Sequence, residues 1–183
     1  YFLLYIFVQS SDMVKKITPS LSKEIEKEIP SGRHLEFFTD FLAAMHETAA
    51  DVARALEITR AAVGHWIKAD DCRLSYCEDY INKKGYDLSF ELIKKSTKKS
   101  EKVMINIETR EATPEDSVCR RLLFLHSALS KMGVSRVQLA KDLGLTYNTV
   151  RHWFVEDNIY VSHIFNIADL YGLQVCISIK PKD

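Results

Sequence analysis

The sequence predicts a mainly α fold with a small antiparallel β-sheet, arranged as tandem duplicated helical bundles. Three observations lead to this prediction. An internal repeat relates two stretches of the chain, helix-capping residues recur inside each stretch, and a short run of strand-forming residues follows each stretch's closing glycine. With 183 residues and 46% hydrophobic content, the chain can bury one sizeable core or two small ones.

The repeat becomes visible when the chain is shifted by 87 residues without gaps, which aligns residues 37–93 with 124–180. Twelve pairs are then identical: Phe37/Phe124, Leu42/Leu129, Met45/Met132, Ala53/Ala140, Leu56/Leu143, Thr59/Thr146, Val63/Val150, His65/His152, Trp66/Trp153, Asp70/Asp157, Ser75/Ser162 and Gly85/Gly172. Unrelated stretches of ordinary composition would share about three. We therefore expect each stretch to be one supersecondary unit.

Capping residues define the first two helices of the second stretch. Thr113 as N-cap and Pro114 in the first turn predict a helix that continues to about Met132. Ser135 predicts the cap of a second helix, which ends at Gly144. The expected buried stripe of this second helix consists of Val137, Leu139, Ala140 and Leu143.

Two more helices follow a short turn at Gly144 and Leu145. Thr146 caps the third helix, and Ser162 opens a fourth that is closed by Gly172. A helix, a short turn and a capped helix make up a helix-turn-helix, so we expect two tandem helix-turn-helix bundles. The residues expected on the buried side of the third helices are Val150, Trp153 and Phe154, together with Trp66 of the first stretch.

Runs of strand-forming residues cover 88–93, 103–107 and 175–180. Residues 94–102 join two of these runs as a basic hairpin loop, so all three strands are expected to form one small antiparallel sheet. The predicted domains are an N-terminal extension 1–34, a first helix-turn-helix unit with its strand 35–93, the basic loop and strand 94–112, and a second unit with its strand 113–183.

Residues 135–153 carry a set of spaced positions that is more specific than a single dipeptide. The set consists of the small Ala140 where the helices cross, Gly144 and Leu145 in the turn, Thr146 as cap, and Val150 and Trp153 in the core. With these residues the segment resembles the helix-turn-helix of the phage repressor and Cro family, and residues 167–173 resemble that family's closing helix. The resemblance implies a sequence-specific DNA-binding protein, a transcriptional regulator that reads the major groove with the helix after Thr146.

The resemblance also implies which side chains contact double-stranded DNA. They are Arg136, Tyr147, Asn148, Thr149, Arg151 and His152. Asn148 can form two hydrogen bonds with an adenine edge, whereas His152 and Tyr147 can each reach a base or a phosphate. Arg136 and Arg151 are expected to hold phosphates.

The first copy keeps the pattern over residues 48–70 but is degenerate, because Glu57 replaces the turn glycine. Its equivalent positions are Arg60, Ala61 and His65, which offer fewer donors. DNA contact by this copy stays open. Two copies that contact adjacent half-sites as a pseudo-dimer within one chain would need third helices about 34 Å apart.

Charge is distributed unevenly, although 25 basic and 25 acidic residues cancel overall and so argue mildly against DNA. Residues 37–93 carry a net charge of −4, 124–180 of +1, and 94–123 of +3. Phosphate neutralisation is therefore expected from the second unit and the loop lysines Lys94, Lys95, Lys98, Lys99 and Lys102.

Several function classes find no support in the sequence. The four cysteines, Cys72, Cys77, Cys119 and Cys176, lack metal-ligand spacing and suggest reduced core thiols in a cytoplasmic protein. Gly-rich phosphate loops and nucleophile elbows are also absent, so we expect no enzyme, no cofactor and no metal. Residues 1–8 are apolar but too short to span a bilayer, and an upstream extension of a start at Met13 would explain them.

Plainer interpretations remain for the same residues. His65 and His152 are equally interpreted as solvated surface histidines, and the lysine loop as a solvated turn. The main alternative function is a protein-interaction or dimerisation module built on degenerate helix-turn-helix units, and a homo-oligomer is compatible with either function.

Overall fold

The computed structural model describes residues 33–94 and 120–182, and within these ranges the chain is mainly helical with a small antiparallel sheet, as the sequence predicts. The described part of this sheet has two strands, β1 and β2. The elements are α1 (Glu36–Ala44), α2 (Ala49–Leu56), α3 (Arg60–Ala69), α4 (Leu74–Lys83), β1 (Tyr86–Lys94), α5 (Leu123–Lys131), α6 (Arg136–Asp142), α7 (Tyr147–Val155), α8 (Val161–Leu170) and β2 (Leu173–Pro181).

The order of elements recurs along the chain. α1 begins at Glu36 and α5 at Leu123, which is 87 residues later, and β1 and β2 begin at Tyr86 and Leu173 with the same spacing. Each set therefore runs through four helices into one strand, in step with the sequence repeat. That the two sets superpose as copies stays a prediction.

The compact units of the structure do not follow the order of the sequence. Among the described residues, unit 1 contains 33–71, 78–89 and 177–182, whereas unit 2 contains 72–77, 90–94 and 120–176. Both strands thus contribute residues to both units, and the segment 72–77, which covers the end of the α3–α4 connection and the first turn of α4, belongs to unit 2.

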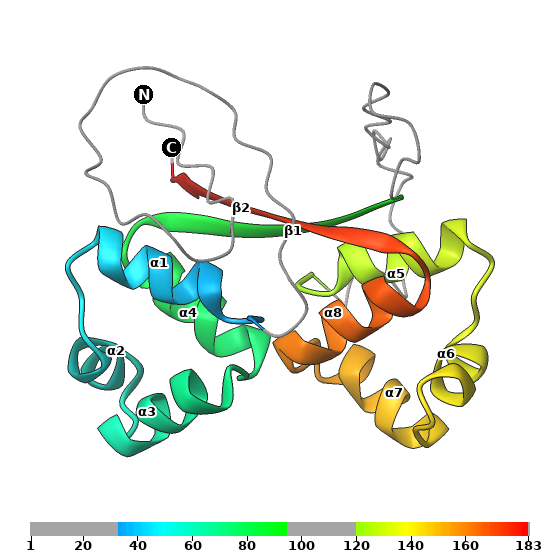
Figure 1. The fold of residues 1–183 in the computed structure, drawn as a ribbon, viewed down its shortest axis with the longest axis horizontal. Coiled ribbons are helices and arrows are strands. Elements are labelled where there is room, and N and C mark those ends of the chain that lie inside the picture. The colour runs from blue at the N-terminus through cyan, green and yellow to red at the C-terminus, as the bar shows by residue number, and fades with distance from the viewer. Residues whose placement is uncertain (1–32, 95–119, 183) are drawn as a thin grey trace. The chain divides into compact units, whose positions relative to one another are not determined.

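The paired strands lie on one side of the helices within each unit (Figure 1). In unit 1, α1 and α4 are next to the strands and α2 and α3 are farther away; in unit 2, α5 and α8 are next to the strands and α6 and α7 farther away. The strand register places Gly85 beside Lys182, because the Lys182 N–H donates to the Gly85 carbonyl at 2.8 Å. The helix-turn-helix segments therefore lie away from the sheet.

Aromatic residues fill the core of unit 1. The rings of Phe38 and Tyr80 meet edge to face at 5.9 Å between centroids, and those of Phe41 and Tyr86 do so at 5.4 Å. Such edge-to-face pairs bring the positive edge of one ring to the negative face of the other. They attach α1 to α4 and to the first residue of β1.

Unit 2 is closed by an aliphatic core between α5, α6, α7 and α8. Leu125, Leu139, Val150 and Ile164 are fully buried, one from each helix. Phe90 of β1 stacks on Phe124 of α5 at 5.6 Å. α7 is thereby held on its inner side by this core, which leaves its other side available to solvent.

Several sequence predictions are wrong in detail. Val137 is 63% exposed and does not belong to the buried stripe of α6, because its side of the first turn of this helix is open to solvent. Trp66 is only half-buried, whereas Trp153 is buried. The fourth helix begins at Val161 after Tyr160, one residue before the predicted Ser162.

Other predictions fall partly or wholly on residues that the structure does not describe. These are Thr113 as a helix cap, the strand over 103–107, the lysines beyond Lys94, and Cys119. The predicted continuous helix from Thr113 to Met132 is wrong where it can be compared, because residues 120–122 form a bend and a turn and α5 begins only at Leu123. Of the remaining cysteines, Cys72 and Cys77 are buried as predicted and are not joined by a disulfide, with their Sγ atoms 3.3 Å apart, while Cys176 is half-buried.

Candidate nucleic-acid interface

The turn between α6 and α7 is built by local hydrogen bonds that the sequence signals predict. Gly144 takes the left-handed conformation at φ 65°, and the Leu145 N–H donates back to the Ala140 carbonyl at 2.8 Å. The Thr146 hydroxyl then accepts from the Thr149 N–H at 3.2 Å and caps α7. These bonds fix where α7 starts and its direction relative to α6.

One face of α7 is exposed and polar. Tyr147, Asn148, Arg151 and His152 are all exposed, whereas Val150, Trp153 and Phe154 on the opposite face are buried. Residues three or four positions apart share one side of a helix, so the structure brings Asn148, Arg151 and His152 together as the sequence predicts. We call Tyr147, Asn148, Arg151 and His152 the α7 face.

Thr149 differs from its neighbours. Its hydroxyl lies 2.8 Å from that of Thr146, and its side chain is half-buried. This contact ties Thr149 to the cap of α7, so its role in the free protein is to position the helix start rather than to present a donor outward.

Arg136 is the first residue of α6 and is oriented by an aromatic contact. Its guanidinium carbon lies 4.6 Å from the centre of the Phe154 ring, within the range of a cation–π interaction. Phe154 is buried in the core, so it holds the arginine stem beside α7. Farther along α6, the Tyr171 hydroxyl donates to Asp142 at 2.8 Å, and burial followed by this bond raises the pKa of Tyr171 to about 12.

The corresponding residues of unit 1 also follow a left-handed turn residue and a capping threonine, but they offer fewer side-chain donors. Thr59 caps α3 by accepting from the Ala62 N–H at 3.2 Å, and Glu57 occupies the turn with a left-handed φ of 57°. Arg60, Ala61 and His65 are all exposed on α3. Only Arg60 and His65 offer side-chain donors, so this face is less suited to contact base edges.

Lys94 is not brought to the α7 face. It is exposed at the last position of β1, on the strand side of unit 2, whereas α7 lies on the side away from the strands (Figure 1). Lys95, Lys98 and Lys99 lie outside the described residues.

Sequence reasoning missed the structural role of the identical pair Asp70 and Asp157. The Asp157 carboxylate accepts from the backbone N–H groups of Arg121, at 2.8 Å, and Leu122, at 2.9 Å, and so caps the start of α5. Asp70 makes the same two contacts with the N–H groups at the start of α1. Their identity at positions outside the apolar pattern was the available signal.

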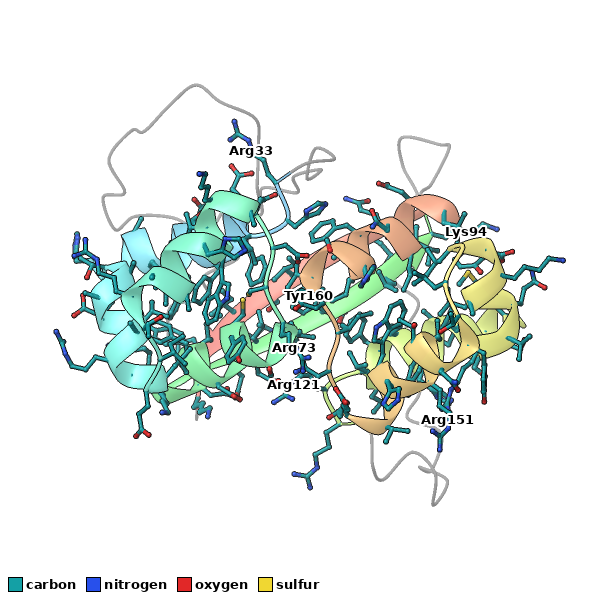
Figure 2. All side chains as sticks on the ribbon, turned by 90° about the horizontal axis from the view of Figure 1, so that it is seen from below. Arg33, Arg73, Lys94, Arg121, Arg151 and Tyr160 are labelled. Carbon is teal, nitrogen blue, oxygen red and sulfur yellow. The ribbon has the colours of Figure 1, made fainter. Side chains whose placement is uncertain are left out.

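Charged residues also surround the loop that follows α7. Sequence reasoning did not predict this group of residues. A guanidinium nitrogen of Arg73 lies 3.6 Å from Glu156 Oε2, and the guanidinium carbon lies 5.9 Å from the centre of the Tyr160 ring. His152 Nδ1 lies 3.7 Å from the other carboxylate oxygen of Glu156. Figure 2 shows Arg73 beside Tyr160, and Arg151 on α7 in the same unit. We call Arg73, Glu156 and Tyr160 the loop cluster.

Backbone pairing holds Arg73 in unit 2. Arg73 and Tyr160 form an antiparallel bridge, the Leu74 N–H donates to the Ile159 carbonyl at 2.8 Å, and the Val161 N–H donates to the Cys72 carbonyl at 2.9 Å. These bonds make the position of the Arg73 backbone independent of its side chain.

Within residues 33–94 and 120–182, no group of three or more metal-ligating side chains occurs. No helix in this part of the chain is long and apolar enough to cross a membrane. No family model, curated protein or solved structure matches the chain. The geometry of α6, α7 and the loop after them therefore carries the functional argument.

Proposed function

We propose that the protein binds double-stranded DNA sequence-specifically and acts as a transcriptional regulator, with α7 of unit 2 in the major groove. The observation that carries this proposal is the α7 face, an exposed row of Tyr147, Asn148, Arg151 and His152 on a capped helix whose opposite side is buried. A helix of this kind fits the major groove, where base edges differ in their donors and acceptors.

Each residue has a chemical task in this proposal. Asn148, in the first turn, forms paired hydrogen bonds with an adenine edge. Arg151 and Arg136 bind phosphates on either side of the groove, and the cation–π contact with Phe154 limits the freedom that Arg136 loses on binding. No acidic residue stands in the first turn of α7, so the positive end of the helix faces the phosphates without local repulsion.

The test starts from selection of bound duplexes out of a random pool, followed by anisotropy titrations of the full chain at several salt concentrations. Asn148→Ala should cost about 1 to 3 kcal/mol on the selected site and relax the preference at one base pair. Arg136→Ala should weaken binding to all duplexes alike and lower the salt slope by about one unit.

Unit 1 supplies the control. Arg60→Ala and His65→Ala alter residues that are also exposed, at the equivalent positions of α3, and we expect less than a twofold loss for each. Losses as large as those of the unit 2 variants would mean that both third helices contact DNA. Absence of salt-dependent duplex binding by the wild-type chain would refute the proposed function.

A protein-interaction module is the second candidate, and one observation favours it. Val137, Tyr147 and Val155 are 63%, 46% and 52% exposed on α6 and α7, which is apolar surface of the kind that interfaces bury. This candidate predicts that Val137→Asp and Val155→Asp abolish self-association or partner binding, measured by sedimentation, in a chain that does not bind DNA.

A further inference from the structure

The loop cluster places a strong cation immediately after the candidate DNA-binding helix. Glu156 is the C-cap residue that follows α7, and its carboxylate lies near both His152 of the α7 face and Arg73. Arg73 does not belong to the second helix-turn-helix in sequence. It is the last residue of the connection between α3 and α4, and the structure includes it in unit 2.

We propose that Arg73 is a phosphate-binding residue of the same DNA surface as α7, and that Glu156 is its partner in the absence of DNA. This inference rests on the proposed function and extends it. The first half of the chain would then take part in DNA binding through one arginine that lies in unit 2, even though its own α3 offers few donors.

The geometry supports this assignment in three ways. Arg73 is about half exposed, so its guanidinium can exchange the carboxylate for a phosphate without leaving its position. A guanidinium forms paired hydrogen bonds with either anion in the same planar geometry. The bridge between Arg73 and Tyr160 fixes the backbone, and the Tyr160 ring at 5.9 Å limits the directions that the side chain takes.

The carboxylate of Glu156 is expected to weaken DNA binding. Its carboxylate is 52% exposed and lies beside two groups that would approach phosphate, so it opposes DNA through like charge and competes for Arg73. An exposed ion pair of this kind adds little to folding stability. Its effect should therefore appear in DNA binding rather than in the thermal midpoint.

The experiment is a double-mutant cycle in the full chain, with binding to the selected duplex measured at several salt concentrations. Arg73→Ala should lower affinity about eightfold at 0.1 M salt and reduce the salt slope by about 0.9, as the loss of one phosphate contact requires. Arg73→Lys should keep the slope. Glu156→Gln should raise affinity about twofold to fivefold, and Arg73→Ala should cost more in the Glu156→Gln background than in the wild type.

Arg54→Ala is the matched control, because Arg54 is also exposed and pairs with an acid, Asp51, at 3.0 Å in unit 1. It should change affinity less than twofold, and both alanine variants should keep the thermal midpoint within about 2 °C of the wild type. If the wild type binds DNA and Asn148→Ala weakens it while Arg73→Ala changes neither affinity nor slope, this inference alone is overturned. If the wild type binds no duplex, the proposed function falls and the inference falls with it.

Discussion

Replacing Asp157 should destabilise unit 2 strongly, because this one carboxylate satisfies two backbone donors at the start of α5. Leu122, whose N–H it accepts at 2.9 Å, is fully buried, so water cannot readily replace the lost acceptor. An unsatisfied buried donor costs about 1 to 3 kcal/mol. The N–H of half-exposed Arg121 can turn to water and should add less, which gives about 2 to 3 kcal/mol for Asp157→Ala.

The backbone of Asp157 allows a sharper test, because it lies in the left-handed region at φ 47°. Glycine tolerates this conformation and alanine does not, a difference of about 1 kcal/mol. An asparagine side chain would keep one acceptor oxygen, so Asp157→Asn should lose roughly half as much as Asp157→Ala. The expected order of destabilisation is therefore alanine, glycine, asparagine.

The assay is urea unfolding followed by the fluorescence of Trp153, in a Trp66→Phe background that leaves unit 2 as the source of the signal. Asp157→Ala should lower the midpoint by about 1 M. Asp70→Ala, observed through Trp66 in a Trp153→Phe background, should cost a similar amount, because Asp70 caps α1 with the same two contacts. A loss below about 0.5 kcal/mol at either position, or glycine more costly than alanine, would refute the reasoning.

Three further predictions concern the turns, a tyrosine and the tryptophans. Glu57→Gly should stabilise unit 1 by up to about 1 kcal/mol and Gly144→Ala should destabilise unit 2 by about 1 to 2 kcal/mol, because both positions have a left-handed backbone. A Cβ added at Gly144 meets no atom within 4 Å, so the expected loss comes from the backbone conformation alone. Thermal unfolding tests both substitutions, and opposite signs would contradict the argument. The pKa of Tyr171 is raised to about 12 from the usual 10.0, so this tyrosine ionises at lower pH in the unfolded chain than in the folded one. The stability present below pH 10.0 should therefore fall as the pH rises through 12. Tyr171→Phe should reduce this fall, measured by urea titrations at each pH. Acrylamide should quench the emission of half-buried Trp66 more than that of buried Trp153 in the single-tryptophan variants, and equal quenching would show that their burial does not differ.

Local features of the fold could be predicted because their causes lie within a few residues. Ser135 and Thr146 each accept a hydrogen bond from the N–H three positions later, and Gly144 takes the positive φ that its place after a helix suggests. The buried residues of α7 likewise follow from helical periodicity. These signals placed α6, α7 and the exposed α7 face correctly.

Long-range contacts could not be predicted in the same way. Asp157 accepts from the N–H of Leu122, which lies 35 residues earlier, and Arg73 pairs with Glu156, which lies far along the chain in the second repeat. No local pattern encodes such distances. Val137 shows the opposite failure, because helical periodicity treats each apolar residue alike and cannot tell that this part of the first turn of α6 is left open to solvent.

The two halves differ where they meet solvent more than where they build their helices. Asp70 and Asp157 cap in the same way, Thr59 and Thr146 cap in the same way, and even Glu57 adopts the backbone of Gly144 at a cost of about 1 to 2 kcal/mol. The first half thus retains the helix-turn-helix backbone while its exposed α3 positions carry few donors. Under the proposed function, Arg73 is the residue through which we expect the first half to contribute to DNA binding, and Arg73→Ala measures that contribution.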